Sequence, residues 1–319
     1  MKVHIVCYED TNAWILGKFA RKLSENLNAL SIPTDISKTP DLNADINHHI
    51  IYYDYDGKKT TIDTVMITHI DSSWKLNRVK GQLRVAVKGI CLSADTVEKL
   101  VRAGIPKEKL SYVNPAHDQV MKPRKIVMGI TSKIQPSGCK REKMLNEIAK
   151  RISPFDFKFK IMGSGWEPIV DNLGRLGFEV EYHNNFNYEV YTQLIPSVDY
   201  YLYFGQDEGS MGFIDALAAG VPTIVTPQGY HLDAKNGITY PFDTLIELEK
   251  VFLSVLEKRN ERIHAVEGWT WRNYAISHLE IWQGILGTNF DLEKMRQPEI
   301  NQQPEIHRNP IRILRRLFR

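Results

Sequence analysis

Two acidic residues, Asp207 and Asp215, lie eight positions apart, one before and one after a glycine-bearing turn. The turn is Gly209-Ser210-Met211-Gly212, and the composition of the next segment, 213–219, predicts a helix. Free N–H groups at the start of that helix would favour an anion such as a diphosphate. The two carboxylates can instead bind the hydroxyl groups of a ribose or a sugar. We therefore interpret this region as a nucleotide-sugar site, although residues 216–225 would also suit any helix-to-strand turn of an α/β protein.

The region from 207 to 233 resembles the retaining GT-B glycosyltransferases of the "glycosyl transferases group 1" type. Their motif has two acids separated by seven residues, then a helix, a Gly-[Val/Ile]-Pro break and a strand, and Gly220-Val221-Pro222 supplies the break here. The family usually has glutamate at both acidic positions. This chain has Asp207 and Asp215, or Glu208 and Asp215 at one residue shorter spacing. The resemblance implies that Asp207 or Glu208 takes the first, catalytic role, that Asp215 binds the donor ribose, and that the 209–212 turn binds the donor.

A second segment offers cations that could neutralise a leaving diphosphate without a metal ion. Lys133 and the run Gly138-Cys139-Lys140-Arg141 resemble the Gly-Arg…Lys-Gly segment of the family, with Lys133 in place of the usual arginine. We expect Lys140 to carry this role first and Lys133 second, with Arg141 as the substitute if the register is off by one. The alternative interpretation is a solvated run of charge at a helix start. Gly163, in a Gly-Ser-Gly turn after a strand, resembles the family's Gly-x-Gly, where a base or ribose approaches the backbone.

His69 lies at the predicted carboxyl end of the strand 64–70, where a doubly wound domain presents ligand groups. The family often has a histidine there, over the donor sugar, and a structural histidine is the alternative. His48-His49 cannot chelate one ion together, because adjacent residues of a strand point to opposite faces. Asp54-Tyr55-Asp56 looks like the metal-binding Asp-x-Asp of the other glycosyltransferase fold. We reject that use, since the rest of the chain resembles GT-B, and we expect no metal site and no cofactor besides the donor substrate.

Strand and helix patterns alternate along the chain and predict an α/β fold of parallel, doubly wound sheets. The resemblance implies two such Rossmann-like domains that face each other across a cleft, as in GT-B. We expect domains at 1–121 and 122–268, and a closing helix at 269–287 that crosses back to the first domain. In the first helix, Trp14 is expected to be a core residue, and the alternative is that Trp14 and Lys18 face an acceptor sugar. Strands are predicted at 2–8, 46–53, 64–70, 84–93, 112–115, 125–130, 157–162, 178–182 and 200–203, and helices at 14–30, 94–103, 142–152 and 167–176.

Composition places the protein among soluble globular chains, with 43% hydrophobic and 25% charged residues in 319. The three cysteines form no CxxC pair, which argues against a disulfide framework and a zinc site. We expect a cytoplasmic protein, because the first ten residues do not form a signal peptide and no window is apolar enough to cross a membrane. The formal net charge is +3, and it falls to −2 without the five arginines of 308–319, so nucleic-acid binding is not expected.

The C-terminal segment differs from the rest of the chain. Residues 288–307, rich in Gln, Asn, Glu and Pro, predict a disordered linker. In a helical projection of 308–319, the apolar residues separate from the arginines. Such a helix can lie on an anionic membrane surface, and the inner face of the membrane is the surface expected here. Docking to a partner protein or to the body of the same chain is an equal alternative. The arginines are Arg308, Arg312, Arg315, Arg316 and Arg319.

These observations together predict a glycosyltransferase that moves a sugar from a nucleotide-diphosphate donor to a glycan or glycolipid acceptor. The resemblance implies retention of the anomeric configuration and a metal-free mechanism. Two alternatives stay open: a GT-B nucleotide-sugar epimerase, and a catalytically silent nucleotide-sugar-binding subunit. The Asp-for-Glu and Lys-for-Arg departures keep the second alternative open.

Overall fold

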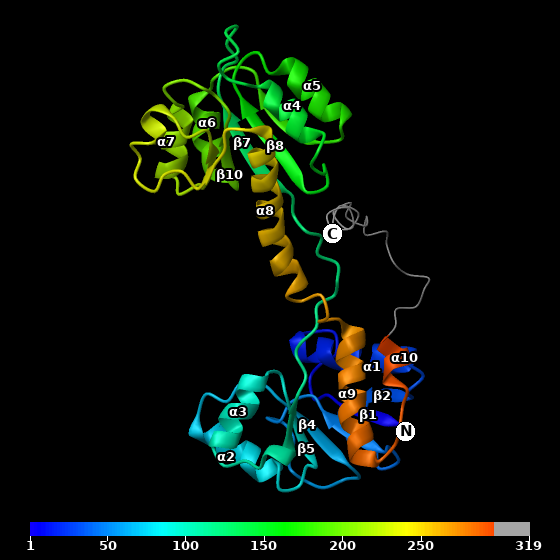
Figure 1. Cartoon of the computed structure of the whole chain (residues 1–319). Coiled ribbons are helices and arrows are strands. Elements are labelled where there is room, and N and C mark those ends of the chain that lie inside the picture. The colour runs from blue at the N-terminus through cyan, green and yellow to red at the C-terminus, as the bar shows by residue number, and fades with distance from the viewer. Residues whose placement is uncertain (297–319) are drawn as a thin grey trace, which may run out of the picture. The chain divides into compact units, whose positions relative to one another are not determined.

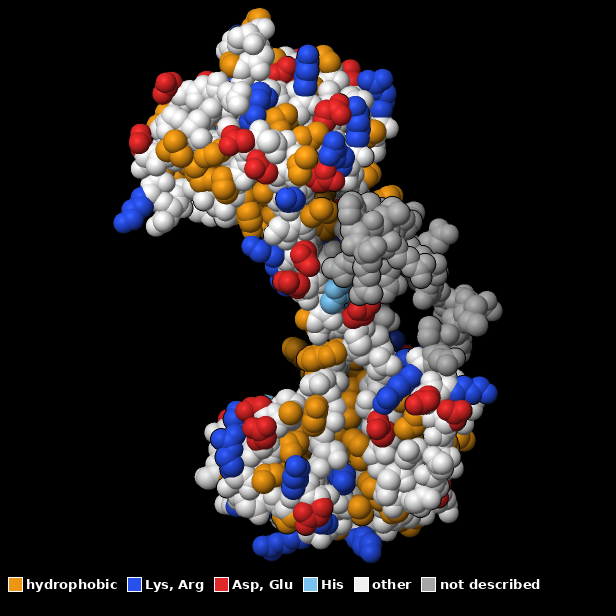
Figure 2. Space-filling view, viewed as in Figure 1, with side chains coloured by type: hydrophobic (Ala, Val, Ile, Leu, Met, Phe, Trp, Pro, Cys, Tyr) orange, Lys and Arg blue, Asp and Glu red, His pale blue; other side chains and the backbone are white. Residues whose placement is uncertain are grey.

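The computed structural model describes residues 1–296 of the chain. They form two compact units (Figure 1). Unit 1 comprises Met1–Val120 together with the described residues from Glu267 on, and unit 2 is Met121–Val266. On the visible face of each unit, acidic, basic and hydrophobic side chains are interspersed (Figure 2). Among the described helices, none combines the length and the apolar character that a bilayer crossing requires.

Unit 1 is built on a six-stranded sheet in the order β2-β1-β3-β4-β5-β6, with every neighbouring pair parallel. Helices α1 (Ile15–Ala29), α2 (Ser73–Gln82) and α3 (Ala94–Arg102) connect the strands. Ser72 and Ser93 begin α2 and α3, since each side chain accepts a hydrogen bond from a backbone N–H of the first turn. The strands are β1 (Val3–Val6), β2 (Thr34–Ser37), β3 (Ile46–His49), β4 (Asp63–Ile67), β5 (Lys88–Cys91) and β6 (Leu110–Tyr112).

Helix α9 (Trp271–Leu286) completes the core of unit 1, although it is distant in the sequence from the strands. It packs along α1, where Phe19 contacts the rings of Trp271 and Tyr274 at centroid distances of 5.4 and 5.6 Å. Gly287 ends the helix in the left-handed conformation. The first unit therefore buries apolar side chains contributed by both the early and the late parts of the chain.

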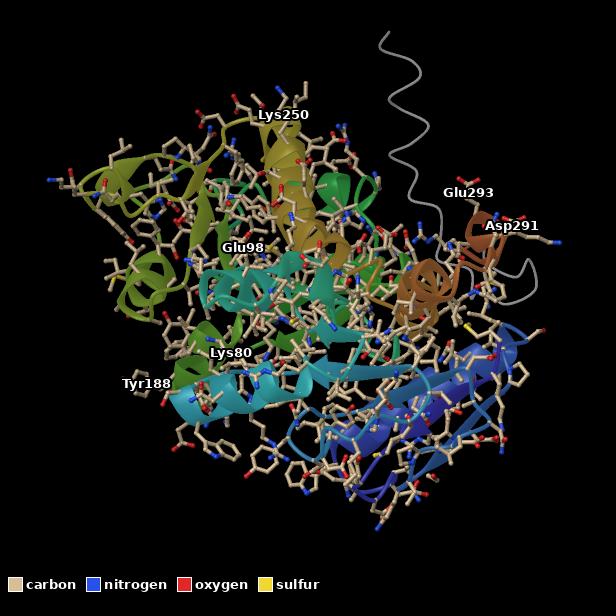
Figure 3. All side chains as sticks on the ribbon, turned by 90° about the horizontal axis from the view of Figure 1, so that it is seen from below. Lys80, Glu98, Tyr188, Lys250, Asp291 and Glu293 are labelled. Atoms are coloured by element: carbon tan, nitrogen blue, oxygen red, sulfur yellow. The ribbon has the colours of Figure 1, made fainter. Side chains whose placement is uncertain are left out.

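A short helix follows where a disordered linker was expected. Residues Leu292–Arg296 form α10, and Asp291 begins it by accepting a hydrogen bond from the Lys294 backbone N–H at 3.0 Å (Figure 3). Arg296 pairs with Glu280 of α9 at 2.8 Å. The linker prediction was thus wrong for 292–296, because apolar Leu292 and Met295 pack against the unit 1 core. Residues 297–307 of that linker and the basic segment 308–319 lie outside the described residues.

Unit 2 has a second parallel six-stranded sheet, in the order β12-β11-β10-β7-β8-β9. The two sheets confirm the predicted class, an α/β chain with two doubly wound Rossmann-like domains. A capping box of Thr244 and Glu247 begins the longest helix of this unit, α8 (Leu245–His264). The strands are β7 (Ile126–Thr131), β8 (Phe157–Met162), β9 (Glu179–His183), β10 (Tyr200–Tyr203), β11 (Thr223–Val225) and β12 (Tyr240–Pro241), and the other helices are α4 (Lys143–Ala149), α5 (Glu167–Arg175), α6 (Tyr188–Leu194) and α7 (Met211–Ala218).

Candidate functional site

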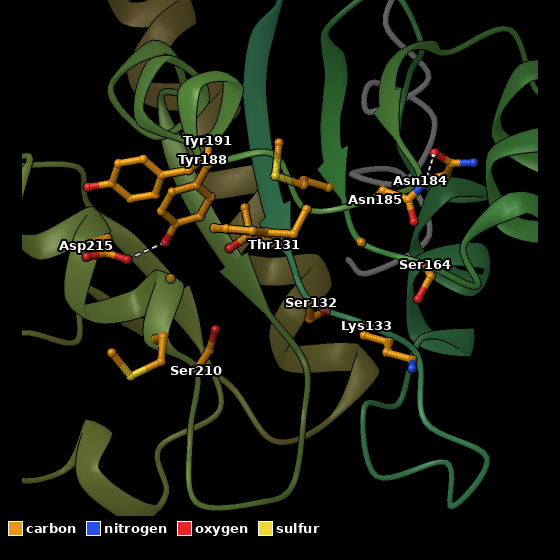
Figure 4. Close-up of a pocket in the computed structure, with 15 residues that line it drawn as sticks. Thr131, Ser132, Lys133, Ser164, Asn184, Asn185, Tyr188, Tyr191, Ser210 and Asp215 are labelled. Carbon is orange, nitrogen blue, oxygen red and sulfur yellow. Dashed lines mark hydrogen bonds between the residues drawn. The ribbon is translucent and has the colours of Figure 1, made fainter.

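The strand order of unit 2 reverses between β7 and β10, which are neighbours in the sheet. In a doubly wound sheet, such a switch point opens a crevice at the carboxyl ends of the strands. A cavity of about 470 Å³ lies there, between the loops after β7, β8 and β9 and the start of α7 (Figure 4). It is lined by Thr131, Ser132, Lys133, Met162, Gly163, Ser164, Asn184, Asn185, Phe186, Tyr188, Tyr191, Ser210, Met211, Gly212 and Asp215.

Tight packing between two loops forms one wall of the cavity. Gly163 has a φ of 138°, and a Cβ there would lie 2.1 Å from the Ser132 carbonyl oxygen, so a side chain does not fit. The buried Trp166 indole donates to the same oxygen at 2.6 Å, which fixes the backbone beside Lys133. Lys133 itself is exposed and has no carboxylate partner among the described residues. The wall therefore presents a cation that no carboxylate of residues 1–296 neutralises.

The opposite wall is the first turn of α7. This helix begins at Met211, two residues earlier than expected, so Met211 and Gly212 place their N–H groups at its start. A Cβ on Gly212 would lie 2.2 Å from the Thr131 hydroxyl oxygen, and the glycine therefore lets α7 approach β7 closely. The positive end of the helix faces the cavity that Lys133 also lines. An anion is the ligand that this pair of walls favours.

His231 holds the turn before α7, and the sequence analysis did not identify it. Its Nε2 accepts a hydrogen bond from the Ser210 N–H at 3.0 Å, and its Nδ1 lies 3.1 Å from the Thr226 carbonyl oxygen. Because Nε2 accepts and the carbonyl can only accept, the proton is on Nδ1 and the ring is neutral. Burial lowers the pKa of His231, which favours the same state. Only its three-dimensional surroundings reveal this role.

Asp215 lines the cavity from α7, and the Tyr191 hydroxyl of α6 donates a hydrogen bond to its carboxylate (Figure 4). Burial, followed by this contact with Asp215, raises the pKa of Tyr191, so the phenol remains a donor. Phe186, Tyr188 and Met211 surround the cavity with exposed fractions of 66%, 70% and 67%. Aromatic and apolar side chains this exposed beside a polar cavity suit a planar, partly apolar ligand group.

Lys140 and Asp207, both predicted site residues, bind each other rather than line the cavity. Lys140 Nζ lies 2.5 Å from Asp207 Oδ2 and 2.7 Å from the hydroxyl of the buried Tyr203. The Tyr203 hydroxyl in turn donates to Asp207 Oδ1 at 2.7 Å. Burial alone would raise the pKa of Asp207, but hydrogen bonds from Lys140, Tyr203 and the Gly209 N–H lower it overall. The Lys140–Asp207–Tyr203 cluster is therefore an ion pair held by a buried phenol.

Arg141 directs its guanidinium into the protein. Its Nε donates to the Phe204 carbonyl at 2.7 Å, one terminal nitrogen to the Asp243 carbonyl at 2.8 Å, and the other to the Thr226 hydroxyl at 2.7 Å. These acceptors come from three loops, so Arg141 ties together the segments that follow β10, β11 and β12. Burial lowers its pKa. The arginine is thus committed to protein acceptors and does not line the cavity.

The remaining candidates, Glu208 and His69, are not among the residues that line the cavity. Glu208 is exposed, and its backbone carbonyl accepts a hydrogen bond from the Tyr230 N–H at 3.1 Å. His69 belongs to unit 1, on the loop after β4, with its side chain 72% exposed. Its Nε2 lies 3.1 Å from Lys75 Nζ and 3.4 Å from Asp71 Oδ2. Among the described residues, no group of three or more His, Cys, Asp or Glu side chains is arranged to hold a metal ion.

Comparison with known proteins gives similarities to solved structures. No protein-family model matches the chain, and no curated protein matches it. The chain is similar to the lipopolysaccharide outer core galactosyltransferase WaaB, with 14% identity, 90% of this chain and 99% of that chain covered, and a TM-score of 0.36. It is also similar to Anabaena HepE in complex with UDP and glucose, with 14% identity, 93% of this chain and 97% of that chain covered, and a TM-score of 0.34. A third similarity is to WaaG, a glycosyltransferase involved in lipopolysaccharide biosynthesis, with 13% identity, 86% of this chain and 95% of that chain covered, and a TM-score of 0.36.

Proposed function

We propose that the chain is a glycosyltransferase that moves a sugar from a nucleotide-diphosphate donor to a glycan or glycolipid acceptor, with retention and without a metal ion. The observation that carries the proposal is the cavity at the unit 2 switch point. It combines a helix N-terminus, a lysine that has no carboxylate partner in residues 1–296, and a carboxylate, all of which line the same cavity. A nucleoside diphosphate offers the matching groups. Its diphosphate is an anion that suits the helix N-terminus and the lysine, and its ribose hydroxyl groups suit the carboxylate.

Each part of the donor has a place along the cavity wall. The diphosphate would lie against the N–H groups of Met211 and Gly212 and near Lys133. Asp215, oriented by the Tyr191 hydroxyl, would accept hydrogen bonds from the ribose. The base would lie among Phe186, Tyr188 and the amide side chains of Asn184 and Asn185.

Transfer requires that the bond between the anomeric carbon and the phosphate oxygen breaks, with its electron pair leaving on the diphosphate. Lys133 and the start of α7 would stabilise that charge, because fixed donors aimed at a developing charge need no reorganisation during the reaction. Lys140 would also stabilise the charge on the diphosphate if Asp207 turned toward the sugar and released the Lys140 ammonium group. The acceptor oxygen would attack from the face that the diphosphate leaves, and its proton would pass to a leaving phosphate oxygen.

The test is to incubate the full chain with UDP-, GDP-, ADP- and CDP-sugars and to measure free nucleoside diphosphate. Release from at least one donor, increased by an added glycan acceptor, is the expected result. Nucleotide-sugar binding without release would favour the silent-subunit alternative and contradict transfer. An epimerised sugar still attached to its nucleotide would favour the epimerase instead.

A variant connects that activity to the cavity. Asp215→Ala should raise the calorimetric Kd for the released nucleoside diphosphate about tenfold or more, since charge-assisted hydrogen bonds contribute ~1.5–3 kcal/mol. Asp233→Ala is the control, because Asp233 is an exposed acid outside the cavity lining. An equal Kd for both variants would refute the proposed ribose contact.

A further inference from the structure

Two aromatic side chains of unit 1 are exposed next to each other at the carboxyl edge of its sheet. Tyr53 follows β3, and Trp74 lies in the first turn of α2, which follows β4. Their exposed fractions are 47% and 53%, and their ring centroids lie 5.5 Å apart. We call this pair, with Arg78, the aromatic platform. The carboxyl edge is where a parallel doubly wound sheet presents its ligand-binding groups.

Hydrogen bonds from α2 hold the platform in place. The buried Gln82 side chain donates to the carbonyls of Tyr52 and Tyr55, the second at 2.6 Å. Arg78 Nε donates to the carbonyl of Tyr53, which lies between Tyr52 and Tyr55 in the sequence, at 2.8 Å. One helix therefore fixes three carbonyls of the loop 52–55, and the exposed ring of Tyr53 is displayed by an ordered backbone rather than by a loose loop.

The platform combines apolar faces with free hydrogen-bonding groups. The Arg78 guanidinium carbon lies 5.8 Å from the centroid of each ring, within the range of a cation–π contact. Among the described residues its hydrogen bond uses Nε, so both terminal nitrogens are available for a ligand. Asp71 and His69 lie on the loop that enters α2, and Lys75 of that helix bridges them at 2.9 and 3.1 Å.

We propose that the aromatic platform binds a saccharide, and that this saccharide is the acceptor of the transfer proposed above, on which this assignment of its role rests. A pyranose ring has an apolar C–H face that packs on aromatic rings and a rim of hydroxyl groups that need hydrogen-bond partners. Tyr53 and Trp74 supply the apolar surface, and the terminal nitrogens of Arg78 supply hydrogen-bond donors for the hydroxyl groups. Two rings bordered by charged side chains have about the extent of one or two sugar units, whereas exposed patches that dock proteins are several hundred Å².

Fluorine NMR of the full chain labelled with 5-fluorotryptophan tests the proposal, because Trp74 reports on the platform directly. Trp74→Phe assigns its signal. The probes are the methyl glycosides of glucose, galactose, mannose and N-acetylglucosamine, and disaccharides built from them. At least one probe should shift the Trp74 signal in a saturable way, and Tyr53→Ala should weaken that binding at least tenfold.

The control variant is Tyr112→Ala, which removes another exposed tyrosine of unit 1, with 49% exposure, at the end of β6. It should leave saccharide binding unchanged, and unchanged signals of the other tryptophans show that each variant is folded. Equal weakening by both tyrosine variants would overturn the proposal, as would a Trp74 signal that no probe shifts. A shift caused by phosphatidylglycerol vesicles but by no saccharide would assign the platform to a membrane surface instead.

The same variants separate this proposal from the proposed function. If saccharides shift the Trp74 signal but no donor releases its nucleotide, the saccharide site stands and the transfer activity fails. If donors are consumed while Tyr53→Ala leaves the acceptor KM unchanged, the transfer activity stands and the platform is not the acceptor site. Both proposals hold if Tyr53→Ala raises the KM for the acceptor and leaves the KM for the donor unchanged.

Discussion

Lys140 and Arg141 are neighbours in the chain, yet the structure gives their charges different surroundings. Lys140 pairs with a carboxylate beside a phenol, whereas Arg141 donates to three uncharged oxygens of the protein. A guanidinium has a rigid set of donors that can satisfy several acceptors at once, which an ammonium group cannot reproduce. The difference between the two residues therefore follows from the shape of their charged groups.

Arg141→Ala should lower the free energy of unfolding by about 2–4 kcal/mol, because it leaves carbonyl and hydroxyl acceptors without their donors. Urea unfolding of the full chain measures the change. Arg141→Lys should recover only part of it, since an ammonium group cannot reach all three acceptors of the guanidinium. Arg102→Ala is the control, as it removes an exposed arginine from an i,i+4 pair and should change stability by less than about 0.5 kcal/mol. A stable Arg141→Ala that loses nucleotide binding would instead make Arg141 a ligand.

Lys133→Ala should weaken nucleoside diphosphate binding roughly ten- to hundredfold, because it removes the cation that lines the cavity without a carboxylate partner. Calorimetry with the released nucleotide measures the effect. Lys143→Ala removes a comparable exposed charge from the start of α4 and should leave the Kd unchanged. Raising the salt concentration should reduce the difference in Kd between the wild-type chain and Lys133→Ala, since salt screens the contact between Lys133 and the diphosphate. An identical Kd for both lysine variants would show that the anion binds elsewhere.

Some elements were predictable from the sequence within a residue of their bounds, whereas others, including the 20-residue helix α8, were not. The bounds of β8 and β10 match the expected ranges. In β8 buried apolar residues alternate with two lysines, and β10 is an apolar run. The edge strands β2 and β12 and the helices α2, α6 and α8 were not predicted, since β2 and β12 are short and partly exposed and α2 has no clear apolar stripe. Trp14 was expected in the core but is 78% exposed, because α1 begins only at the next residue.

The candidate site could be predicted only in part for a similar reason. The glycine turn and Asp215 are local features, so their spacing was visible along the chain. Tyr191 and His231 contact Asp215 and Ser210 across 24 and 21 positions of the chain, and no short-range pattern marks them. Likewise, the pairing of Lys140 with Asp207 spans 67 positions. Such contacts depend on the sheet order that brings the loops together.

Helix α9 adds three aromatic residues, Trp271, Tyr274 and Trp282, and the buried His278 to unit 1. The His278 ring lies 5.1 Å from the His48 ring of β3 and 5.3 Å from Trp282. Neither His48 Nε2 nor His278 Nε2 has a hydrogen-bond partner among the described residues. Burial lowers the pKa of His278 to about 4 and the pKa of His48 well below its usual value. Both rings are therefore neutral in the folded protein at neutral pH.

This pair predicts that acid destabilises the protein. Below the usual histidine pKa of 6.5 the unfolded chain binds protons that the folded chain does not bind until about pH 4. The free energy of unfolding should therefore fall as the pH is lowered through that window, by up to about 3 kcal/mol for His278. Urea unfolding at several pH values measures the slope. His278→Gln should flatten it, whereas the exposed-site control His264→Gln should not, and equal slopes in both variants would contradict the assignment.

At the scale of the whole molecule, the proposed reaction depends on charges that the chain itself supplies. Nucleoside diphosphate release should therefore continue in excess chelator, with chromatographic detection so that the chelator does not affect the readout. Lys133 and the start of α7 provide the positive charge. Loss of release in chelator, followed by recovery with added magnesium or manganese, would show that a divalent ion takes part.

The return of α9 to unit 1 has a consequence for how the protein is made. Trp271, Tyr274, Leu279 and Trp282 belong to the same core as β1 and β3, but a ribosome adds them after all of unit 2, Met121–Val266. Domains usually complete in the order of synthesis. Here the second unit can close while the first still lacks its last helix and exposes its apolar sheet face. A nascent chain that stalls after about residue 266 would present one finished unit and one open core, which is the state that chaperones recognise.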